Sequence, residues 1–360
     1  MVVNVKSRVG FHRRLLLFVS LMMLFGLLIS LFSCTTAMDA ENTSLKKTVH
    51  VKSETDLYNA VYNLPYGAAV VIVLNNDITL TKGSLAISDN KDVTLTSKKA
   101  TNFYKLIGAT KRAEDHSLAT YEDTITVYRG VLRLDGIIIT HEKDIFGTGI
   151  CVYEDGTLIM YDGKISGNHI PYAYVGHGSF VGNGGGVYNW GVFEMFNGII
   201  SDNTAGNGGG GVYHLGTFTM YNGTISNNSA SWYGGGVYGG GVFEMFNGII
   251  SGNTAGIQGG GVDNRRNFTM HNGTITNNHA NQMGGGIYNS GTFHKLNGTI
   301  SDNTAPEGNN IYPQENNTIE DVEDNNKLFN TISYVGIFVI VKVSVISVLF
   351  LYLKKKKNSQ

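Results

Sequence analysis

The sequence predicts an all-β fold, a parallel β-helix in which each coil of about 25 residues contributes three short strands. Three observations predict it. A triple glycine recurs every 25 residues, a single glycine recurs with the same period, and the decapeptide GVFEMFNGII occurs at both 191–200 and 241–250. A fixed period of this length indicates a solenoid. The triple glycines begin at 184, 209, 234, 259 and 284, and the single glycines are Gly198, Gly223, Gly248, Gly273 and Gly298.

The type of solenoid follows from the content of one repeat. The segment GGGVYNWGVFEMFNGIISDNTA holds three apolar pieces, VY, VFEMF and II, separated by Gly and Asn. Short pieces rich in Val, Ile, Phe and Tyr between turn residues are typical of strands. No repeat contains an amphipathic window of helical length, which excludes leucine-rich and helical repeats. Each strand should therefore pair with its counterpart one coil away, at about 4.7–4.9 Å.

Stacked coils place residues 25 apart above one another, so equivalent side chains form ladders. We expect apolar ladders inside the solenoid and two structural asparagine ladders, whose amides can hydrogen-bond along the axis. The interior ladders are Phe193, Phe218, Phe243, Phe268 and Phe293; Ile200, Ile225, Ile250, Ile275 and Ile300; Val187, Val212, Val237, Val262 and Ile287; and Met195, Met220, Met245 and Met270, ending in Lys295. The asparagine ladders are Asn203, Asn228, Asn253, Asn278 and Asn303, and Asn197, Asn222, Asn247, Asn272 and Asn297.

Charged residues are sparse in the repeats, because like charges repeated at about 5 Å would repel at every coil. At one position Glu194 and Glu244 alternate with Thr219 and Thr269, so the carboxylates never occupy adjacent coils. The doubled decapeptide is therefore interpreted as one strand–turn–strand piece, and the copied unit as a pair of coils.

The motif GGGVY followed by F-x-M-x-N-G-x-I-S-x-N-T-A resembles the polymorphic-outer-membrane-protein type repeat. That repeat occurs in pectate-lyase-like, right-handed β-helix surface proteins of bacteria and archaea, commonly called adhesin-like proteins. The resemblance covers 184–305 and extends more weakly back to about Thr48. It implies a right-handed coil and, by association, an adhesive role.

The N-terminus predicts an export signal at 1–37. Basic residues at 6–14 precede the uncharged apolar run Leu15–Phe32, the pattern of a signal peptide. The segment Leu31–Cys34 resembles a lipobox with an atypical Phe at its second position. Cleavage after Ala37 and an uncleaved anchor are the alternatives.

The C-terminus predicts a membrane anchor. An acidic, Asn-rich linker at 313–331 leads to the apolar segment 332–353, which exceeds the roughly 20 residues that a transmembrane helix needs. The basic tail 354–360 should remain cytoplasmic, which places the repeats outside the cell at its surface. Lys342 costs about 2.5–3.5 kcal/mol at mid-membrane, and the apolar residues around it should outweigh that cost.

The parallel β-helix is expected to span 48–312, with its regular repeats at 184–305. An amphipathic helix at 55–64 should cover the open edge of the first coil. Residues 98–122 are polar and interrupt the pattern, which predicts an excursion from one corner before the strands resume at Ile125.

Two surface features are candidates for ligand binding. Alternation along the strand directs Phe196, Tyr221, Phe246, His271 and Leu296 outward, and Tyr188, Tyr213, Tyr238 and Tyr288 form a second column. Flat rings suit sugar faces or a protein partner, although stacked rings also stabilise a sheet on their own. A ten-residue insertion around 169–182 places Tyr172, Tyr174, His177 and Phe180 in a loop, where specificity commonly resides.

One repeat departs from the pattern and offers a candidate anion-binding or catalytic patch of Asp263, Arg265, Arg266 and His271. The resemblance to polysaccharide lyases implies clustered acids for calcium and a basic residue for catalysis. Asp263 has tyrosines at the matching positions one coil away, and a calcium ion prefers six to eight oxygen ligands. The sequence therefore predicts no catalytic residue, no metal and no cofactor.

Three functions remain in view. The first is a membrane-anchored, adhesin-like surface protein that binds a glycan or protein of a host or neighbouring cell. The second is a polysaccharide lyase or hydrolase, and the third is a passive structural surface protein. The lipid bilayer is an expected partner. Nucleic acid is not, because the net charge is −1 and no basic patch is evident.

Overall fold

The computed structural model describes residues 46–97, 103–109, 122–176 and 179–313. The chain divides into two compact units, Met1–Thr48 and Val49–Gln360, and the solenoid belongs to the second. The predicted export signal, the apolar segment 332–353 and the basic tail lie outside the described residues, as does the linker beyond Pro313. Within the described ranges, no helix is both long and apolar enough to cross a bilayer.

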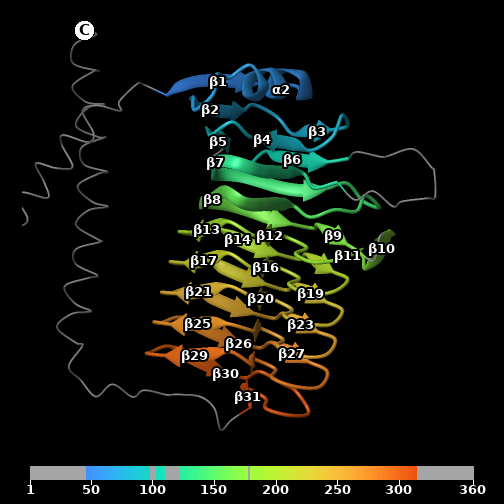
Figure 1. Cartoon of the computed structure of the whole chain (residues 1–360), viewed down its shortest axis with the longest axis vertical. Coiled ribbons are helices and arrows are strands. Elements are labelled where there is room, and N and C mark those ends of the chain that lie inside the picture. Colours follow the sequence, from blue (N-terminus) through green and yellow to red (C-terminus); the bar gives the residue numbers. More distant parts are fainter. Residues whose placement is uncertain (1–45, 98–102, 110–121, 177–178, 314–360) are drawn as a thin grey trace, which may run out of the picture. The chain divides into compact units, whose positions relative to one another are not determined.

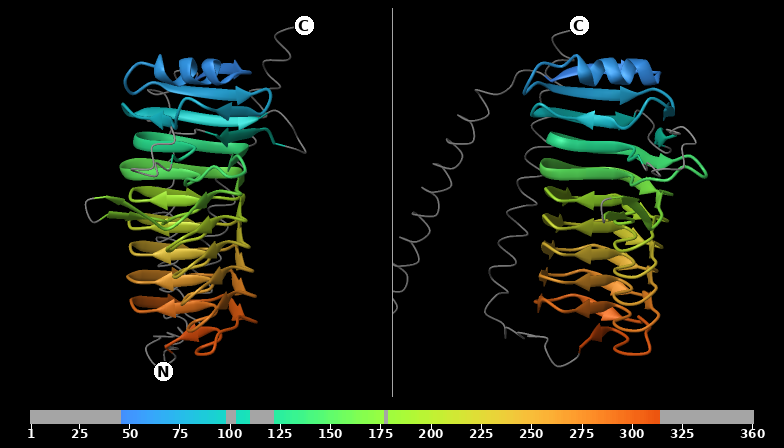
Figure 2. Two further views of the ribbon diagram at one scale, coloured as in Figure 1. Left: turned by 90° about the vertical axis from the view of Figure 1, so that its right-hand side faces the viewer. Right: turned by 45° about the vertical axis from the view of Figure 1, so that its right-hand side comes forward.

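The second unit is a right-handed parallel β-solenoid of about ten turns. Successive coils stack along one axis, as Figures 1 and 2 show, and strands of equivalent position pair in parallel register. Phe193 is in register with Phe218, and Phe218 with Phe243, which confirms the 25-residue spacing on which the fold prediction rests.

The N-terminal coils use longer and less regular strands. They comprise β1 (Lys47–Val51), β2 (Ala69–Leu74), β3 (Ile78–Leu80), β4 (Leu85–Ile87), β5 (Lys91–Ser97), β6 (Lys105–Gly108), β7 (Ile125–His141), β8 (Ile150–Ser166) and β9 (His169–Ile170). The predicted excursion at 98–122 is wrong in part, because β6 lies within it and pairs with both β3 and β7. Leu106 is fully buried, so this short piece completes the core between two polar stretches.

Four of the regular coils contain four strands rather than three. The first coil has β12 (Val187–Asn189), β13 (Val192–Met195), β14 (Ile199–Ser201) and β15 (Thr204–Ala205). The next three have β16 (Val212–His214), β17 (Thr217–Met220), β18 (Thr224–Ser226) and β19 (Ser229–Ala230); β20 (Val237–Gly239), β21 (Val242–Met245), β22 (Ile249–Ser251) and β23 (Thr254–Ala255); and β24 (Val262–Asn264), β25 (Asn267–Met270), β26 (Thr274–Thr276) and β27 (His279–Ala280). The last full coil has three strands, β28 (Ile287–Asn289), β29 (Thr292–Lys295) and β30 (Thr299–Ser301), and β31 (Ile311–Tyr312) begins the following coil by pairing with β28.

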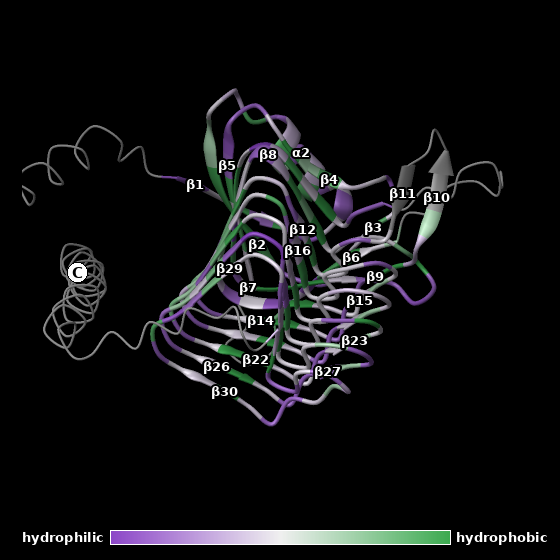
Figure 3. Cartoon of the chain, turned by 60° about the horizontal axis from the view of Figure 1, so that its bottom comes forward, coloured by the Kyte–Doolittle hydropathy of each residue, from purple (hydrophilic) through white to green (hydrophobic). Residues whose placement is uncertain are grey.

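The fourth strand escaped prediction because it is only two residues long and lacks an apolar run. It forms a separate five-stranded sheet, β27-β23-β19-β15-β9, whose inward Ala side chains are buried. In Figure 3, a view tilted toward the last coil, the strands of successive coils lie one behind another.

Helix α2 (Glu54–Tyr62) covers the first coil, close to the predicted 55–64. Ser53 caps it by accepting a hydrogen bond from the backbone N–H of Asp56, and two acidic residues in its first turn suit the helix dipole. Leu57 and Val61 are fully buried and join the core, so the amphipathic face points into the end of the solenoid. This confirms the capping helix.

The apolar ladders are interior, as predicted. Neighbouring rings of the Phe ladder are stacked, for example Phe218 and Phe243 at 4.8 Å and 3°. The Ile, Val and Met ladders are buried as well until the last coil, where Ile300 and Lys295 are only partly covered. A turn before each inner Ile requires glycine: Gly198 has φ of +100°, and a Cβ there would lie 2.5 Å from the Met160 side chain.

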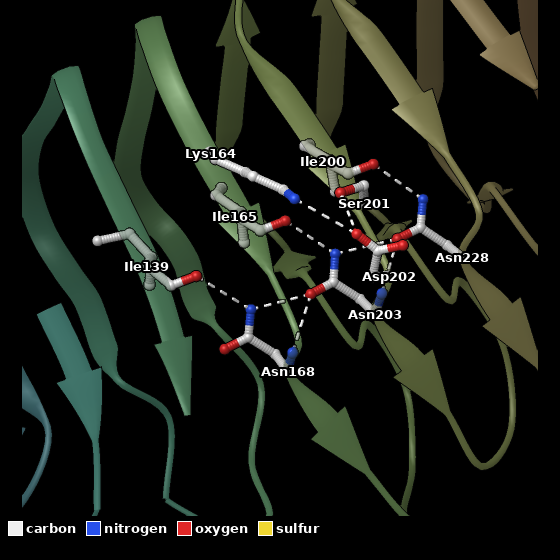
Figure 4. A network of polar contacts seen from close by, with 9 residues as sticks. All are labelled: Ile139, Lys164, Ile165, Asn168, Ile200, Ser201, Asp202, Asn203 and Asn228. Carbon is white, nitrogen blue, oxygen red and sulfur yellow. Dashed lines mark hydrogen bonds and ion pairs between the residues drawn. The ribbon is translucent and has the colours of Figure 1, made fainter. Parts of the chain in front are cut away.

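The Asn203 ladder is buried and polarised along the axis (Figure 4). The Nδ2 atom of Asn203 donates to Oδ1 of Asn228 at 3.0 Å and to the carbonyl of Ile165 at 3.0 Å. The same oxygen of Asn228 accepts the backbone N–H of Asn203, and the pattern repeats down to Asn303. The amide oxygen and the amide nitrogen of each side chain are therefore both hydrogen-bonded inside the core, where an unsatisfied polar group would destabilise the fold.

The ends of this ladder were not foreseen. Asn168 extends it by one coil, and His141 closes it, with Nδ1 lying 2.8 Å from Oδ1 of Asn168. At the other end Asn310 accepts from Asn303 at 3.1 Å. The second predicted ladder, at Asn197 and its equivalents, lies at the surface, and no hydrogen bonds join its amides in the described part of the chain. These side chains precede the glycine turn and point outward.

Candidate binding surface

The outward aromatic residues form one continuous stack, which we call the outer stripe: Phe196, Tyr221, Phe246 and His271. Their centroids are separated by 4.6, 5.4 and 4.2 Å, at interplanar angles of 18°, 14° and 3°. Tyr161 of β8 extends the stack by one coil, at 5.4 Å from Phe196. Leu296 occupies the same position in the last coil and is exposed.

Stacking decides which part of each ring a ligand can touch. Tyr221 and Phe246 have a ring against both faces, so only their edges reach solvent. A sugar ring therefore cannot lie flat on them, contrary to the expectation from the sequence. Ring edges carry the positive part of the aromatic quadrupole. The outer stripe consequently offers a row of weakly positive edges that favour oxygen atoms of a ligand.

The strands on either side of the outer stripe present an alternating pattern, and we call the outward surface of β13, β14 and their equivalents the alternating face. Val192 is in register with Thr217, and Thr217 with Val242. Ile199, Thr224 and Ile249 follow the same order on the neighbouring strand. Apolar coils thus alternate with polar coils from β13 to β25, and the last coil carries Thr292 and Thr299 at these positions.

The two carboxylates of the alternating face belong to the apolar coils. Glu194 is in register with Thr219, and Thr219 with Glu244, as predicted. Both glutamates are partly exposed. They are thus two coils apart, about 9.4–9.8 Å. Hydroxyl or amide donors of a ligand could reach them there.

The tyrosine column lies along another edge of the solenoid. Tyr213 and Tyr238 are stacked at 4.4 Å and 3°, and Tyr188 meets Tyr213 edge-on at 5.3 Å. The column is interrupted in the next coil, where Asp263 stands in register between Tyr238 and Tyr288. A carboxylate is too short to fill the space that a ring fills elsewhere.

Arg265 fills that space. Its Nη2 donates to Oδ2 of Asp263 at 3.0 Å, and its Nε forms an ion pair with Oδ1 although the N–H does not point along a hydrogen bond. Gln258 Nε2 also donates to Asp263, at 3.2 Å. Burial raises the pKa of Asp263 to about 6, against the opposing effect of Arg265. Here the pair acts as a structural substitute for a tyrosine.

The four-residue patch predicted in this repeat is not one site. Asp263 is fully buried and bound to Arg265, whereas His271 lies in the outer stripe against Phe246. Arg266 is exposed in the turn between β24 and β25. The structure therefore brings together only two of the four residues, and the acid of that pair is sealed from solvent.

The predicted loop is a hairpin of β10 (Ala173–Gly176) and β11 (Ser179–Val181), which projects from the solenoid in Figure 1. Tyr174 is the backbone partner of Phe180 in this antiparallel pair, and His177 lies outside the described residues. Tyr172 at the base packs against Trp232 at 4.8 Å, and both rings are exposed. The hairpin is thus attached to a coil that lies 60 residues further along the chain.

A second row of exposed rings was missed in the sequence. Tyr128 and Tyr153 stack at 4.9 Å, and Trp190 lies in the following coil, where Asn189 is in register with Val152. The shared VY motif and the 25-residue step from Tyr128 to Tyr153 were available as a signal. The looser spacing upstream of the glycine repeats concealed it.

The remaining candidate for chemistry is the buried cysteine. Burial raises the pKa of the Cys151 thiol well above its usual range, and the nearby Asp123 strengthens the effect. A buried, protonated thiol is unreactive. Burial also raises the pKa of Asp123 to about 7. No group of three or more His, Cys, Asp or Glu side chains in the described part of the chain is arranged to hold a metal ion.

The fold is established by the structure itself, through the in-register ladders of a right-handed parallel β-solenoid. Comparison with models of protein families, with curated proteins and with solved structures finds no match to this chain. Function therefore has to be inferred from the outer stripe, the alternating face and the corner hairpin.

Proposed function

We propose that the chain is an adhesin-like protein of the cell surface, which binds a glycan or protein ligand through the outward side of its solenoid. In this proposal the export signal carries the solenoid out of the cell and the apolar segment 332–353 anchors it in the membrane. The solenoid is a rigid support whose outward side chains can vary, because the buried ladders and the backbone hydrogen bonds between strands hold the coils together.

The observation that carries the proposal is the repetition of side chains that the fold does not require. Val192 and Val242, Phe196 and Phe246, and Ile199 and Ile249 are identical pairs that point outward. A solenoid needs only its inward ladders to repeat. Repeated outward side chains form a regular array, and an array suits a ligand that is contacted at several points.

Binding is favoured over catalysis by the state of the polar groups. Asp263 is fully buried and paired with Arg265, and Cys151 is buried and protonated. Neither group can approach a substrate. The outer stripe and the alternating face expose aromatic edges, hydroxyl groups and single carboxylates, which recognise a surface rather than activate a bond.

The corner hairpin is proposed as a second contact region. Its backbone projects beyond the coils, and Tyr172 anchors its base to Trp232. Loops held by a rigid scaffold commonly determine specificity. The hairpin and the outer stripe could therefore contribute independently to binding.

The test uses the full-length chain displayed on an expressing cell. Surface protease treatment should remove the repeats from intact cells, and labelled cells should bind to a glycan array or to a panel of host cells. Substitution of Tyr172→Ala with Tyr174→Ala should reduce that binding. Unchanged binding would remove the hairpin from the proposal, and repeats that stay protected from protease would contradict surface display.

A further inference from the structure

The alternating face repeats every second coil from β13 to β25, and the last coil, with Thr292 and Thr299, departs from this order. In one coil its residues are Val192, Glu194 and Ile199, and in the next they are Thr217 and Thr224, with the buried Thr219 between them. The third coil then returns to Val242, Glu244 and Ile249. The exposed fractions of the four Val and Ile side chains lie between 37 and 44 %, so these are solvent-facing positions.

The packing of the solenoid does not require this longer period, although copying of a two-coil unit would produce it. The inward ladders repeat at every coil, with Phe193, Phe218 and Phe243 alike. Charge repulsion explains why Glu194 and Glu244 are separated by a threonine, but it does not constrain the uncharged positions at 192 and 199. Apolar groups therefore recur about 9.4–9.8 Å apart along the axis, with hydroxyl groups midway between them.

A ligand that matches this pattern must itself alternate. Its successive units should be spaced like neighbouring coils, with every second unit presenting the same side. A linear β-1,4-linked glycan has this property, because successive rings are turned by half a turn and one pyranose ring spans roughly the distance between coils. Its C–H groups could pack on the Val and Ile rows while its hydroxyl groups meet the threonines.

Charge selects among such chains. Glu194 and Glu244 are partly exposed, and Lys164, the cation in register with Ile199, is engaged with Asp202 at 3.4 Å. An acidic polymer would therefore be repelled at the two coils that carry Glu194 and Glu244. A second copy of this chain, set apolar coil against apolar coil, would likewise oppose its own glutamates. A neutral glycan, whose hydroxyl groups can donate to the carboxylates, avoids both costs.

We propose that the alternating face binds a neutral, linear glycan with a two-sugar repeat, lying along the solenoid axis. The inference rests on the proposed function and specifies its ligand. The edges of Phe196, Tyr221 and Phe246 border this track and present their positive rims to the sugar oxygens.

Two opposite double variants of the full-length protein in detergent test the period itself. Val192→Thr with Ile199→Thr converts an apolar coil into a hydroxyl coil, and Thr217→Val with Thr224→Ile does the reverse. All four side chains point outward, so the fold should survive, which circular dichroism and thermal melting verify. Thr254→Val on β23 is the matched control, because it adds a similar apolar area on the separate five-stranded sheet.

Titration calorimetry with cellohexaose is the readout. Both double variants should weaken binding, on the order of tenfold, because each breaks the alternation, while Thr254→Val leaves the affinity unchanged. Maltohexaose, which is neutral but lacks the half-turn repeat, and hexagalacturonate, which is acidic, should bind more weakly than cellohexaose to the unmodified protein.

Three results would overturn the inference. The first is stronger binding by Thr217→Val with Thr224→Ile, which would mean that apolar area alone matters. The second is equal affinity for maltohexaose. The third is no binding of cellohexaose by a protein that still binds cells or an array, which leaves the proposed function standing. Absence of binding to every cell and glycan would instead remove the proposed function together with this inference.

Discussion

Arg265 donates to the buried carboxylate of Asp263 at 3.0 Å and closes a gap in a column of tyrosines. Its guanidinium lies 5.1–5.8 Å from the centroids of three rings, Tyr233, Tyr238 and Tyr288. The two residues occur together in the one repeat that lacks the column's tyrosine. Arg265 thus compensates for the replacement of the column's tyrosine by Asp263, two positions earlier in the chain.

Substitution of Arg265 alone should therefore lower the stability of the fold more than substitution of Asp263 and Arg265 together. Arg265→Ala leaves Asp263 buried without its cation, which we expect to lower the free energy of unfolding by about 2–3 kcal/mol. This is below the ~3–5 kcal/mol of a fully buried pair, because the Arg265 side chain is 31 % exposed. Asp263→Tyr with Arg265→Ser restores the residues of the following coil and should retain the stability of the unmodified protein. Urea unfolding measures both, and equal loss in the two variants would contradict the compensation.

The pH dependence of Arg265→Ala provides a second check. Burial raises the pKa of Asp263 above its ordinary value, so ionisation of this group destabilises the folded state as pH rises through the interval from 3.8 to about 6. Loss of the cation should raise the pKa of Asp263 further, so that stability continues to fall up to a higher pH. The difference in stability between the variant and the unmodified protein should therefore be larger at pH 8 than at pH 4.

The asparagine ladder should tolerate no gap. Asn253→Ala removes the acceptor of the Asn228 backbone N–H and the donor to the carbonyl of Ile225. We expect a loss of about 2–4 kcal/mol, since two buried polar groups remain without partners. Asn247→Ala, in the exposed column of the same coil, is the control and should change stability by less than about 0.5 kcal/mol. A similar effect of both substitutions would refute the structural role of the buried ladder.

Phe243 and Phe246, three residues apart, should likewise differ in their contribution to stability, because one is buried and the other points outward. Phe243→Ala empties a site between Phe218 and Phe268 and should cost about 3–5 kcal/mol. Phe246→Ala removes an outward ring that is stacked on Tyr221 and His271, and should cost only about 1 kcal/mol. Thermal and urea unfolding of the two variants compare them directly. A larger loss at Phe246 would mean that the inside and outside of the coil are misassigned.

His214 should make the protein sensitive to acid. The ring is fully buried, its Nδ1 meets the carbonyl of Gly216 at 3.2 Å, and its Nε2 has no hydrogen-bond partner among the described residues. Burial lowers the pKa of His214 to about 4. Between pH 6.5 and about 4 the unfolded chain therefore binds a proton that the folded chain refuses, and stability falls as the pH falls.

The equivalent residue is Gly239 in the next coil and Asn in three others, Asn189, Asn264 and Asn289, so His214→Asn is a conservative test. The variant should lose less stability than the unmodified protein when the pH is lowered from 7 to 4.5. Urea unfolding at several pH values gives the comparison. Parallel curves for the two proteins would show that His214 is not the responsible group.

The ladders could be predicted from the sequence, whereas the residues that close their ends could not. Phe193 and Asn203 recur at a constant interval, and the stacking geometry converts that interval directly into contacts. His141 occurs only once and closes the ladder through a tertiary contact with Asn168, so no period could reveal it. The two-residue strand Thr204–Ala205 lacked an apolar run and was missed for a related reason.

The sequence predicted which side chains point outward, but not which part of each side chain is exposed to a ligand. Alternation along the strand placed Phe196 and Tyr221 outside, which the structure confirms. Whether a ring shows its face or its edge depends on side-chain rotation and on its neighbours, which a single sequence does not specify. The pairing of Asp263 with Arg265 is similar, because it depends on a long side chain folding back over its own strand.

The identical decapeptides at 191–200 and 241–250 also define two interchangeable junctions. Joining residue 190 to residue 241 would delete two whole coils and still leave every inward column in register, because the strands of each coil pair only with those of its neighbours. The rod would become shorter by about 9.4–9.8 Å, and an added pair would lengthen it by the same amount. Loss or gain of a coil pair can thus change the length of the solenoid in fixed steps without changing the packing of the coils that remain.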